Sequence, residues 1–329
     1  MYRVTISSPE PQLPPGREPL LSVIVATYNR SNVLRHTIES VLRSSVSDFE
    51  LLVIGDACTD DSADVVAAFG DRRIAFTNLA RNFGEQSGPN NHGCRAARGR
   101  FIAYLNHDDF YFPDHLEAAI ACLERSGADL AYAPVAAAAR RSREELARGE
   151  LRFTLHGASA SGRYEPYVFA PASAWVLRRE LASAVGPWRP AVECYTESSQ
   201  DWLFRAWKQG RSLRCTGKLG VLTLPTGERQ GVYANREEHE NRYYAGRLRD
   251  DPRLLREQIL GGVALDLAAR KSFPGKPLSM KRFWRKLSYA PCLRLGVHPR
   301  AAKTLVRGWG RGRGIHELRR IRGLRPLER

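Results

Sequence analysis

The sequence predicts an α/β domain with a mainly parallel sheet and flanking helices, followed by a helical, basic C-terminal region. Short apolar segments rich in β-branched residues alternate with segments whose apolar residues recur at helical spacing. Of the 329 residues, 43% are hydrophobic and 26% charged, which is typical of a globular protein and excludes a wholly disordered chain. Most of the net charge of +16 belongs to residues 271–329, which contain seventeen Lys and Arg against two Glu.

The first elements follow a proline-rich start. Five prolines within residues 1–19 predict a flexible lead-in, because each proline fixes φ and removes a backbone donor. The run Leu20–Ala26 has the pattern of a strand buried on both faces, and we expect Ser31 or Asn32 to cap the next helix. The same alternation predicts strands at 49–54, 73–77, 101–105 and 129–135, and helices at 62–69, 92–98 and 114–125.

The regularity weakens after Ala136. The Ala-rich and Arg/Glu-rich sequence to Glu150 predicts an exposed helix, and residues 237–270 predict helix with a break at Asp251-Pro252. We divide the chain into a lead-in at 1–19, an α/β domain at 20–230 and a helical, basic region at 231–329. Further strands are expected at 164–169, 174–177, 213–216 and 221–224, with a helix at 200–208.

The basic region 271–329 interleaves aromatic and aliphatic residues with Lys and Arg. Such a pattern predicts peripheral contact with an anionic membrane; the alternatives are a cap folded onto the domain and a nucleic-acid-binding tail, the last being the least favoured. We expect a cytoplasmic location, because the sequence has no apolar segment of about 18 residues and no apolar core of signal-peptide length. The six cysteines lack metal-binding spacing and are interpreted as reduced packing residues.

Polar side chains follow three of the predicted strands. The first strand leads into Thr27-Tyr28-Asn29-Arg30, the second into Gly55-Asp56, and the fourth into Asn106-His107-Asp108-Asp109. Because open α/β sheets bind ligands beyond the carboxyl ends of their strands, these segments predict one cleft. Adjacent carboxylates such as Asp108 and Asp109 favour a hard cation, Mg²⁺ or Mn²⁺, shared with a diphosphate; the alternative is a solvated turn that caps the helix after Pro113.

Taken together, these motifs resemble the family 2 glycosyltransferases of GT-A fold, a Rossmann-like architecture, of the bacterial polysaccharide and lipid-glycan type. The resemblance covers roughly Leu20 to Thr226. Each motif is weak alone, but their order and spacing are specific. They are Ser22-Val23-Ile24-Val25-Ala26-Thr27-Tyr28-Asn29-Arg30, the run Phe49–Ile54 with Asp56 and Thr59-Asp60-Asp61-Ser62, Asn91-His92-Gly93 with Ala96 and Gly99, the acidic stretch through Pro113-Asp114, and Gln200-Asp201-Trp202.

The resemblance implies a nucleotide-sugar site and gives each matching position a role. Asp56 would accept the imide N–H of uracil or thymine, and its alternative is an N-cap of the next helix. Asp108 would hold ribose or the metal, and Asp109 would bind the metal that bridges the diphosphate. The remaining residues implied to line the nucleotide-sugar pocket are Ala26, Thr27, Tyr28, Arg30 and Asn91, with the Tyr28 ring available to stack on the base.

The sequence departs from the family pattern at two acids. Asn106 stands where the family's Asp-x-Asp-Asp has its first aspartate, and Gly55 replaces the first of two acids after the second strand. The resemblance also implies that Asp201 is the catalytic base, which removes the acceptor proton; its alternative is an acid at a helix N-terminus. Glu197 is the substitute base, and we expect Trp202 on the acceptor side.

The residues themselves predict a metal, a nucleotide and a catalytic base, and the resemblance implies an inverting, metal-dependent glycosyltransferase. The donor is a UDP-sugar or a dTDP-sugar, because thymine offers Asp56 the same imide, and the acceptor is a hydroxyl of a glycan, a lipid-linked glycan or a small molecule. The alternative function is a non-catalytic protein that binds a membrane or nucleic acid through its basic tail. A dinucleotide-dependent oxidoreductase is excluded, because Thr27-Tyr28-Asn29-Arg30 is no Gly-x-Gly-x-x-Gly turn.

Overall fold

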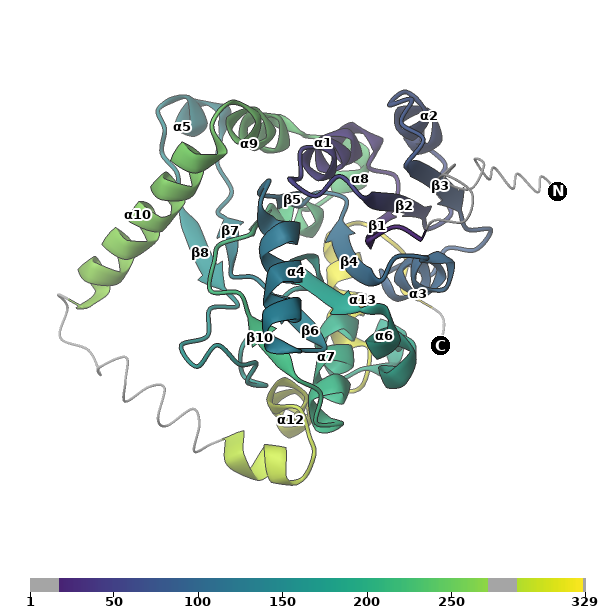
Figure 1. Cartoon of the computed structure of the whole chain (residues 1–329), viewed down its shortest axis with the longest axis vertical. Coiled ribbons are helices and arrows are strands. Elements are labelled where there is room, and N and C mark those ends of the chain that lie inside the picture. Colours follow the sequence, from purple (N-terminus) through teal and green to yellow (C-terminus); the bar gives the residue numbers. More distant parts are fainter. Residues whose placement is uncertain (1–17, 272–288, 328–329) are drawn as a thin grey trace.

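The computed structural model describes residues 18–271 and 289–327, and most of the predicted lead-in at 1–19 lies outside these ranges. The chain folds into two sheets with helices around them, which confirms the predicted α/β class (Figure 1). The helices are α1 (Ser31–Leu42), α2 (Ser62–Ala67), α3 (Ser87–Ala96), α4 (His115–Ser126), α5 (Arg143–Ala147), α6 (Arg179–Val185), α7 (Ser198–Lys208), α8 (Val232–Asn235), α9 (His239–Asp250), α10 (Pro252–Lys271), α12 (Pro299–Val306) and α13 (Arg313–Ile321), with the 3-10 turns η1 (Ala172–Ala174), η2 (Ala191–Glu193) and η3 (Pro225–Glu228).

The larger sheet has seven strands in the order β10-β6-β9-β4-β1-β2-β3. Strands β1, β2, β3 and β4 pair in parallel, whereas β9 pairs antiparallel with both β4 and β6. All residues of β2 are buried, as expected for a central parallel strand covered on both faces. The strands are β1 (Leu21–Thr27), β2 (Phe49–Gly55), β3 (Ile74–Asn78), β4 (Phe101–Asn106), β6 (Leu130–Tyr132), β9 (Trp175–Arg178) and β10 (Leu213–Cys215).

The smaller sheet has four strands and lies beside the larger one. Its order is β5-β11-β7-β8, and its own hydrophobic cluster includes Phe110, Tyr244 and Ile259. Because Tyr244 lies in α9 and Ile259 in α10, these two helices cover this sheet. The strands are β5 (Phe110–Tyr111), β7 (Val135–Ala138), β8 (Phe153–His156) and β11 (Val221–Thr223).

Glu50 lies on β2 as a fully buried charge at the start of the parallel sheet. Its carboxylate accepts hydrogen bonds from the Ser22 hydroxyl at 2.6 Å and from the Arg98 amide at 2.7 Å. The Arg98 guanidinium also donates to it, from Nε at 3.0 Å and Nη2 at 2.8 Å. These bonds compensate a buried carboxylate and tie β1 and β2 to the segment that leads into β4.

We expect Glu50→Ala to lower the free energy of unfolding by about 3 kcal/mol, because it removes the acceptor of these charge-assisted bonds from a buried site. Urea denaturation measures this change. The control is Glu124→Ala, because the Glu124–Arg100 pair at 3.1 Å is half exposed on both sides, and it should cost under about 0.5 kcal/mol. Equal losses in the two variants would contradict the prediction.

Two expected elements differ between residues 129 and 150. The single strand expected at 129–135 is split at Pro134 into β6 and β7, which belong to different sheets. The helix expected at 136–150 was wrong for its first half, where β7 pairs with β11 and β8. Ala136 and Ala138 are buried in the smaller sheet, so tertiary pairing overrides the high helix propensity of alanine. Only residues 143–147 form helix α5.

The strand expected at 164–169 was also wrong. This segment forms turns and irregular backbone, with a single bridge between Arg163 and Arg214. Pro166 lies in the middle of the segment, and a proline has no N–H to donate to a strand neighbour.

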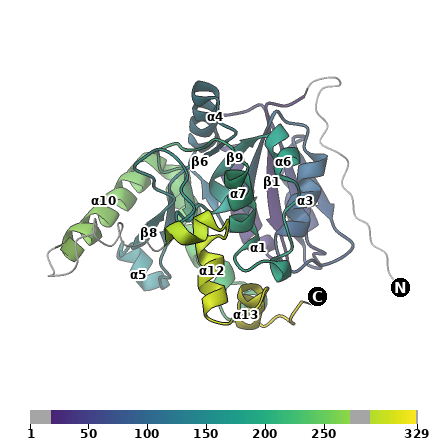
Figure 2. The ribbon, with the colours of Figure 1, turned by 90° about the horizontal axis from the view of Figure 1, so that it is seen from below.

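The described part of the basic region folds back onto the α/β domain, so it resembles the cap considered as an alternative to the membrane-bound tail. Figure 2 shows α12 and α13 together beside the domain, while α10 projects from it. The Gly312 amide donates to the Cys194 carbonyl at 3.0 Å, and Arg300 pairs with Glu197 at 2.9 Å. Residues 272–288 of the predicted tail lie outside the described ranges. Within 18–271 and 289–327, every helix is too short or too polar to cross a bilayer.

Candidate active site

A cavity of about 800 Å³ opens at the carboxyl ends of β1, β2 and β4. Its lining comes from these strand ends and the loop after β3, and from η2, the start of α7, α12 and α13. The cleft predicted from the three polar strand ends is therefore present. Its polar lining includes Thr27, Tyr28, Asp56, Glu85, Asn106, His107, Asp108, Tyr195, Glu197, Tyr233, Arg300, Arg313, Glu317, Arg319 and Arg322.

Asp56 lies at the end of β2 and is buried. Its two carboxylate oxygens accept hydrogen bonds from the amides of Phe83 and Gly84, each at 2.7 Å. It does not cap α2, so the alternative role considered for it is excluded. Burial raises the pKa of Asp56 to about 6, although the two amides oppose this rise. Each oxygen retains a lone pair, so the carboxylate can accept a further donor from the cavity.

Tyr28 and the residues before it form the β1 side of the cavity. Ala26, Thr27 and Tyr28 all line it, and the Tyr28 ring meets the Tyr233 ring edge-on at 5.3 Å between centroids. Arg30 is fully buried behind this wall, where its Nη2 donates to the Thr226 hydroxyl at 3.2 Å. Arg30 therefore does not line the cavity, which differs from the expectation.

Asp108 is the carboxylate of the acidic motif that reaches the cavity. Its Oδ2 accepts the Thr226 hydroxyl at 2.7 Å and the Gly227 amide at 3.1 Å. Burial alone would raise the pKa of Asp108, but neighbouring positive charges, Arg30 among them, hold it below its ordinary value. Asp108 is therefore an ionised acceptor in the cavity wall.

Asp109 lies behind Asp108 and is not part of the cavity lining. Its Oδ2 accepts hydrogen bonds from the Ser173 hydroxyl at 2.5 Å and from the Asn106 amide at 3.0 Å. Burial, together with the nearby charge of Asp108, raises the pKa of Asp109 to about 8. The structure thus places Asp108 in the cavity lining and Asp109 behind it, bonded to Ser173 and Asn106.

Asn91 also differs from expectation. Its side-chain amide exchanges two hydrogen bonds with the backbone of Trp188, at 2.9 Å and 2.8 Å, and it does not line the cavity. It links α3 to the loop that precedes α7.

The two candidate bases lie one helical turn apart at the start of α7. Glu197 lines the cavity, and Arg300 pairs with it; burial alone would raise the pKa of Glu197, but Arg300 brings it below its ordinary value. Asp201 lies next to the cavity wall and is one of the charges close to Cys194, which lines the cavity. Its carboxylate accepts from Arg205 Nε at 3.0 Å and contacts Arg189 Nη1 at 3.5 Å.

Trp202 does not reach an acceptor side in this structure. Only 1% of its surface is exposed, and its ring stacks on Trp175 at 5.8 Å and on Trp188 at 6.3 Å. Its indole N–H donates to the Gly186 carbonyl at 2.8 Å. Trp202 is therefore a core residue that fixes α7 against β9.

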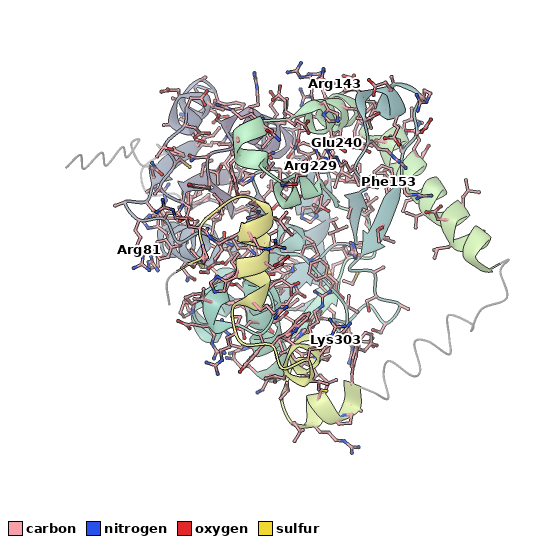
Figure 3. The ribbon with its side chains drawn as sticks, turned by 180° about the vertical axis from the view of Figure 1, so that it is seen from behind. Arg81, Arg143, Phe153, Arg229, Glu240 and Lys303 are labelled. Atoms are coloured by element: carbon pink, nitrogen blue, oxygen red, sulfur yellow. The ribbon has the colours of Figure 1, made fainter. Side chains whose placement is uncertain are left out.

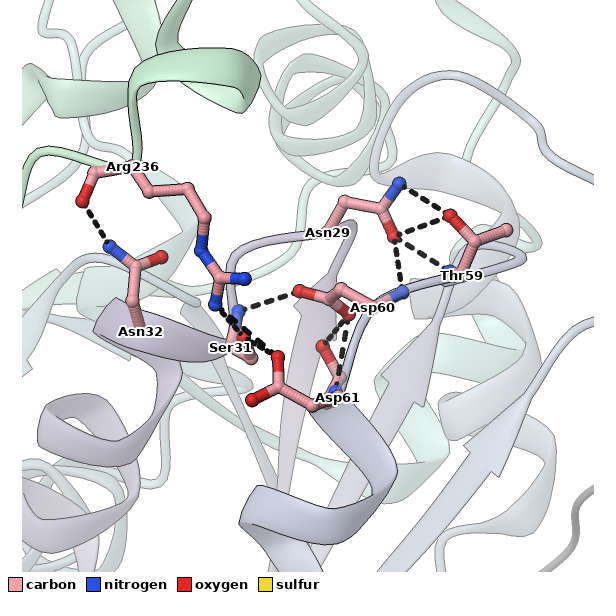
Figure 4. Close-up of polar contacts among 8 residues, drawn as sticks. Asn29, Ser31, Asn32, Thr59, Asp60, Asp61 and Arg236 are labelled. Carbon is pink, nitrogen blue, oxygen red and sulfur yellow. Dashed lines mark hydrogen bonds and ion pairs between the residues drawn. The ribbon is translucent and has the colours of Figure 1, made fainter.

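The loops after β1 and β2 are held together by a network of polar bonds (Figure 4). Asn29 Oδ1 accepts from the Thr59 amide at 2.7 Å, and Asn29 itself has a left-handed backbone with φ +45°, which asparagine tolerates. Asp60 Oδ2 accepts from the Ser31 amide at 3.0 Å. The first helix is therefore capped by Asp60 of the neighbouring loop, and the expected caps Ser31 and Asn32 lie inside α1.

Several residues of the cavity could not be found from the motifs. Glu85 lines it and accepts from the Ser87 amide at 2.9 Å, and burial raises the pKa of Glu85. Tyr233 comes from α8, and Arg319 and Arg322 come from the basic region. No local signal marks these positions, because the contacts that bring them to the strand ends span most of the chain.

Comparisons with known proteins agree with this architecture. Residues 22–186, half of the chain, match the sequence model described as glycosyl transferase family 2. The succinoglycan biosynthesis protein ExoO of Rhizobium meliloti (strain 1021) is 37% identical over 113 residues, which are 34% of this chain and 32% of that protein. WfgD of Escherichia coli, named UDP-Glc:alpha-D-GlcNAc-diphosphoundecaprenol beta-1,3-glucosyltransferase, is 32% identical over 114 residues, or 34% of this chain and 44% of that protein. The matches span less than half of the length of these relatives.

Two solved structures share the fold at low sequence identity. S. aureus TarS 1–349 in complex with UDP-GlcNAc has a TM-score of 0.51 at 19% identity, covering 62% of this chain and 58% of that chain. The mannosyltransferase PcManGT from Pyrobaculum calidifontis, in complex with GDP-Man and Mn²⁺, has a TM-score of 0.51 at 16% identity, covering 93% and 90%. At these identities the likeness concerns the fold, and it confirms the predicted GT-A class.

Proposed function

Because the chain belongs to glycosyl transferase family 2, we propose that it transfers a sugar from a nucleotide-sugar to a hydroxyl of a glycan or lipid-linked acceptor, with inversion at the anomeric carbon. The observation that carries this proposal is the pair of buried carboxylates, Asp56 and Asp108, that face one cavity at the carboxyl ends of β2 and β4. One carboxylate suits the base of a nucleotide and the other suits a cation beside its diphosphate.

The nucleobase that we propose for the donor is uracil. The Asp56 carboxylate is an acceptor without a donor, and the uracil imide offers one N–H, whereas cytosine lacks a donor at that position. Tyr28 lies on the same wall and offers a ring face for stacking. Thymine carries the same imide, so dTDP-sugars compete with UDP-sugars in this proposal. The UDP-GlcNAc complex of TarS supports a UDP-sugar, and the GDP-Man complex of PcManGT makes GDP a necessary comparison.

A divalent cation, Mg²⁺ or Mn²⁺, fits the residues around Asp108. Within the described ranges, no three His, Cys, Asp or Glu side chains gather in a metal-binding group. Asp108 is, however, an ionised carboxylate at the cavity wall, and Mg²⁺ in proteins is commonly held by one or two carboxylates together with substrate phosphates and water. Asp108 would hold the metal, and the metal would neutralise charge on the departing diphosphate. The Mn²⁺ in PcManGT supports this proposal.

The proton of the acceptor hydroxyl must leave as the oxygen attacks the anomeric carbon. We assign this proton to Asp201, with Glu197 as the alternative. Glu197 lines the cavity, and Asp201, which is not part of the lining, follows one helical turn later close to Cys194 of the lining. The Arg205 contact at 3.0 Å orients the Asp201 carboxylate.

A lipid-linked acceptor is supported by the diphosphoundecaprenol in the name of WfgD. Contact of the basic region with an anionic membrane remains part of the proposal for such an acceptor.

Calorimetric binding of UDP, dTDP, GDP and CDP, with Mn²⁺ and with a chelator, tests the donor site. We expect UDP to bind best, the chelator to weaken it, and Asp56→Asn to weaken it at least tenfold, because a donor N–H then faces the imide. UDP affinity should fall about tenfold from pH 7 to pH 5, since Asp56, whose pKa is about 6, takes up a proton in this range.

The Asp56→Asn variant also controls for titration of the nucleotide phosphate. Residue 56 does not titrate in this variant, so any pH dependence of UDP binding that remains comes from the ligand. A preference for GDP or CDP would overturn the assignment of the base. A folded protein that binds none of the four nucleotides would overturn the proposed function, and the non-catalytic alternative that acts through the basic region would then be favoured.

A further inference from the structure

Helices α12 and α13 and the residues to Arg325, here called the C-terminal arm, form one wall of the nucleotide cavity. Helix α13 contacts η2, and Figure 3 shows α13 lying across the domain with Lys303 on α12 near its lower end. Arg319 is buried, and its Nη1 donates to the Gly84 carbonyl at 3.0 Å. The Gly84 amide in turn donates to Asp56. The arm is thus joined to the loop that holds the Asp56 carboxylate.

Arg322 lines the same cavity beside Asp108. Its Nε donates to the Gly227 carbonyl, and the Gly227 amide donates to Asp108. A side-chain carbon built on Gly227 would lie 3.3 Å from Arg322 Nη2 and 3.4 Å from Asp108 Oδ2, so the guanidinium and the carboxylate flank one point in the cavity. A side chain at Gly227 would therefore contact both groups. The bond to Gly227 uses the Nε–H of Arg322, so its Nη groups can donate to a ligand in the cavity.

Both carboxylates of the proposed nucleotide site are thus joined to the arm, Asp56 through Gly84 to Arg319 and Asp108 through Gly227 to Arg322. Phosphates bound at Asp108 would therefore come next to Arg322. A guanidinium binds phosphate oxygens through paired N–H donors in a planar fork. Arg30 and Arg229 are also close to Asp108, but neither lines the cavity. Arg30 is fully buried and donates to Thr226, and Arg229 pairs with Glu237 and Glu240. Arg322 is therefore the guanidinium near Asp108 that can meet a ligand in the cavity.

We propose that Arg322 binds the diphosphate of the donor and that Arg319 positions the arm for this contact. The inference rests on the proposed function, because it concerns the same nucleotide site. It assigns a binding role to the basic region, which lies outside the part of the chain that matches the family. Part of the positive charge of the arm, at Arg322, then binds the diphosphate of the donor.

The test compares UDP with UMP on the full chain in Mn²⁺ by calorimetry. Arg322→Ala should weaken the binding of UDP at least tenfold and the binding of UMP by much less. The lost contact is with the diphosphate, and UMP has only one phosphate. Arg322→Lys, which keeps the charge and loses the planar fork, should recover part of the loss. Arg319→Ala should weaken UDP and UMP by equal factors, as a positioning residue does. Lys303→Ala removes one exposed positive charge from α12 and should change neither affinity more than twofold.

The outcomes separate this inference from the proposed function. If the parent protein binds UDP and Arg322→Ala binds it equally well, the arm has no phosphate-binding role and the proposed function stands. If Arg322→Ala weakens UDP and UMP equally, Arg322 only positions the arm, and the inference is overturned. If the parent protein binds no nucleotide, the proposed function fails and this inference fails with it. Thermal unfolding of each variant shows whether a loss of binding reflects loss of the fold.

Discussion

Replacing Asp108 by asparagine should lower the rate of sugar transfer about a thousandfold. Asp108 is the carboxylate of the acidic motif that faces the cavity, and asparagine keeps its size and its contacts with Thr226 and Gly227 while removing the negative charge. A neutral amide holds a divalent cation poorly, so charge on the leaving diphosphate would lose most of its neutralisation. Initial rates at saturating Mn²⁺, with a UDP-sugar that the parent protein turns over, measure the effect.

Asp109→Asn is the matched control for this prediction. Asp109 receives hydrogen bonds from Ser173 and Asn106 outside the cavity lining, and the asparagine carbonyl can accept both. Its transfer rate should fall less than tenfold. A thousandfold loss in Asp109→Asn with near-parent activity in Asp108→Asn would restore the order expected from the sequence, with Asp109 as the metal ligand.

Replacing Asp201 by asparagine should lower kcat by about a thousandfold, the range expected when a general base is removed. Asparagine can still accept the hydrogen bond from Arg205, so α7 should keep its structure. UDP affinity should stay within about twofold of the parent, because Asp201 is not part of the cavity lining that contains Asp56 and Asp108. The ratio of the loss in kcat to the loss in UDP affinity distinguishes a base from a donor-binding residue.

Glu197→Gln separates the two candidate bases. Glu197 lines the cavity and is paired with Arg300 at 2.9 Å. Glutamine keeps the size of the side chain but is neutral, so its contact with Arg300 would be weaker. We expect a loss in kcat below tenfold. If kcat falls about a thousandfold in Glu197→Gln but not in Asp201→Asn, Glu197 is the base that accepts the proton. Asp201 would then be an acidic residue at the start of α7 that pairs with Arg205.

The parallel strands were predictable because each is a short apolar run that is buried on both faces. Strand β2 begins at Phe49 as expected and extends one residue further, to Gly55. The same reasoning located the cavity, since the polar residues after β1, β2 and β4 meet at one edge of the sheet. Asp56 could be found in this way because its role depends on its position directly after a strand.

Other features depend on contacts that no local pattern records. The run at Ala136 has high helix propensity, but its small side chains suit a strand in the smaller sheet. Neighbouring acids such as Asp108 and Asp109 look alike in sequence, and only the turn after β4 decides which one faces the cavity. Trp202 fits a ligand platform and a core position equally well by spacing alone.

The antiparallel strand β9 limits where the chain can be truncated. It comes from Trp175–Arg178 but inserts between β4 and β6, both of which are formed before residue 133. A fragment ending after α4 would therefore present the hydrogen-bonding edge of β4, a run of buried apolar residues, to the solvent. Long apolar strand edges of this kind pair with other chains and aggregate. The half of the domain that carries Asp56 and Asp108 is thus no autonomous module, and fusions or split reporters need the chain to continue past Arg178.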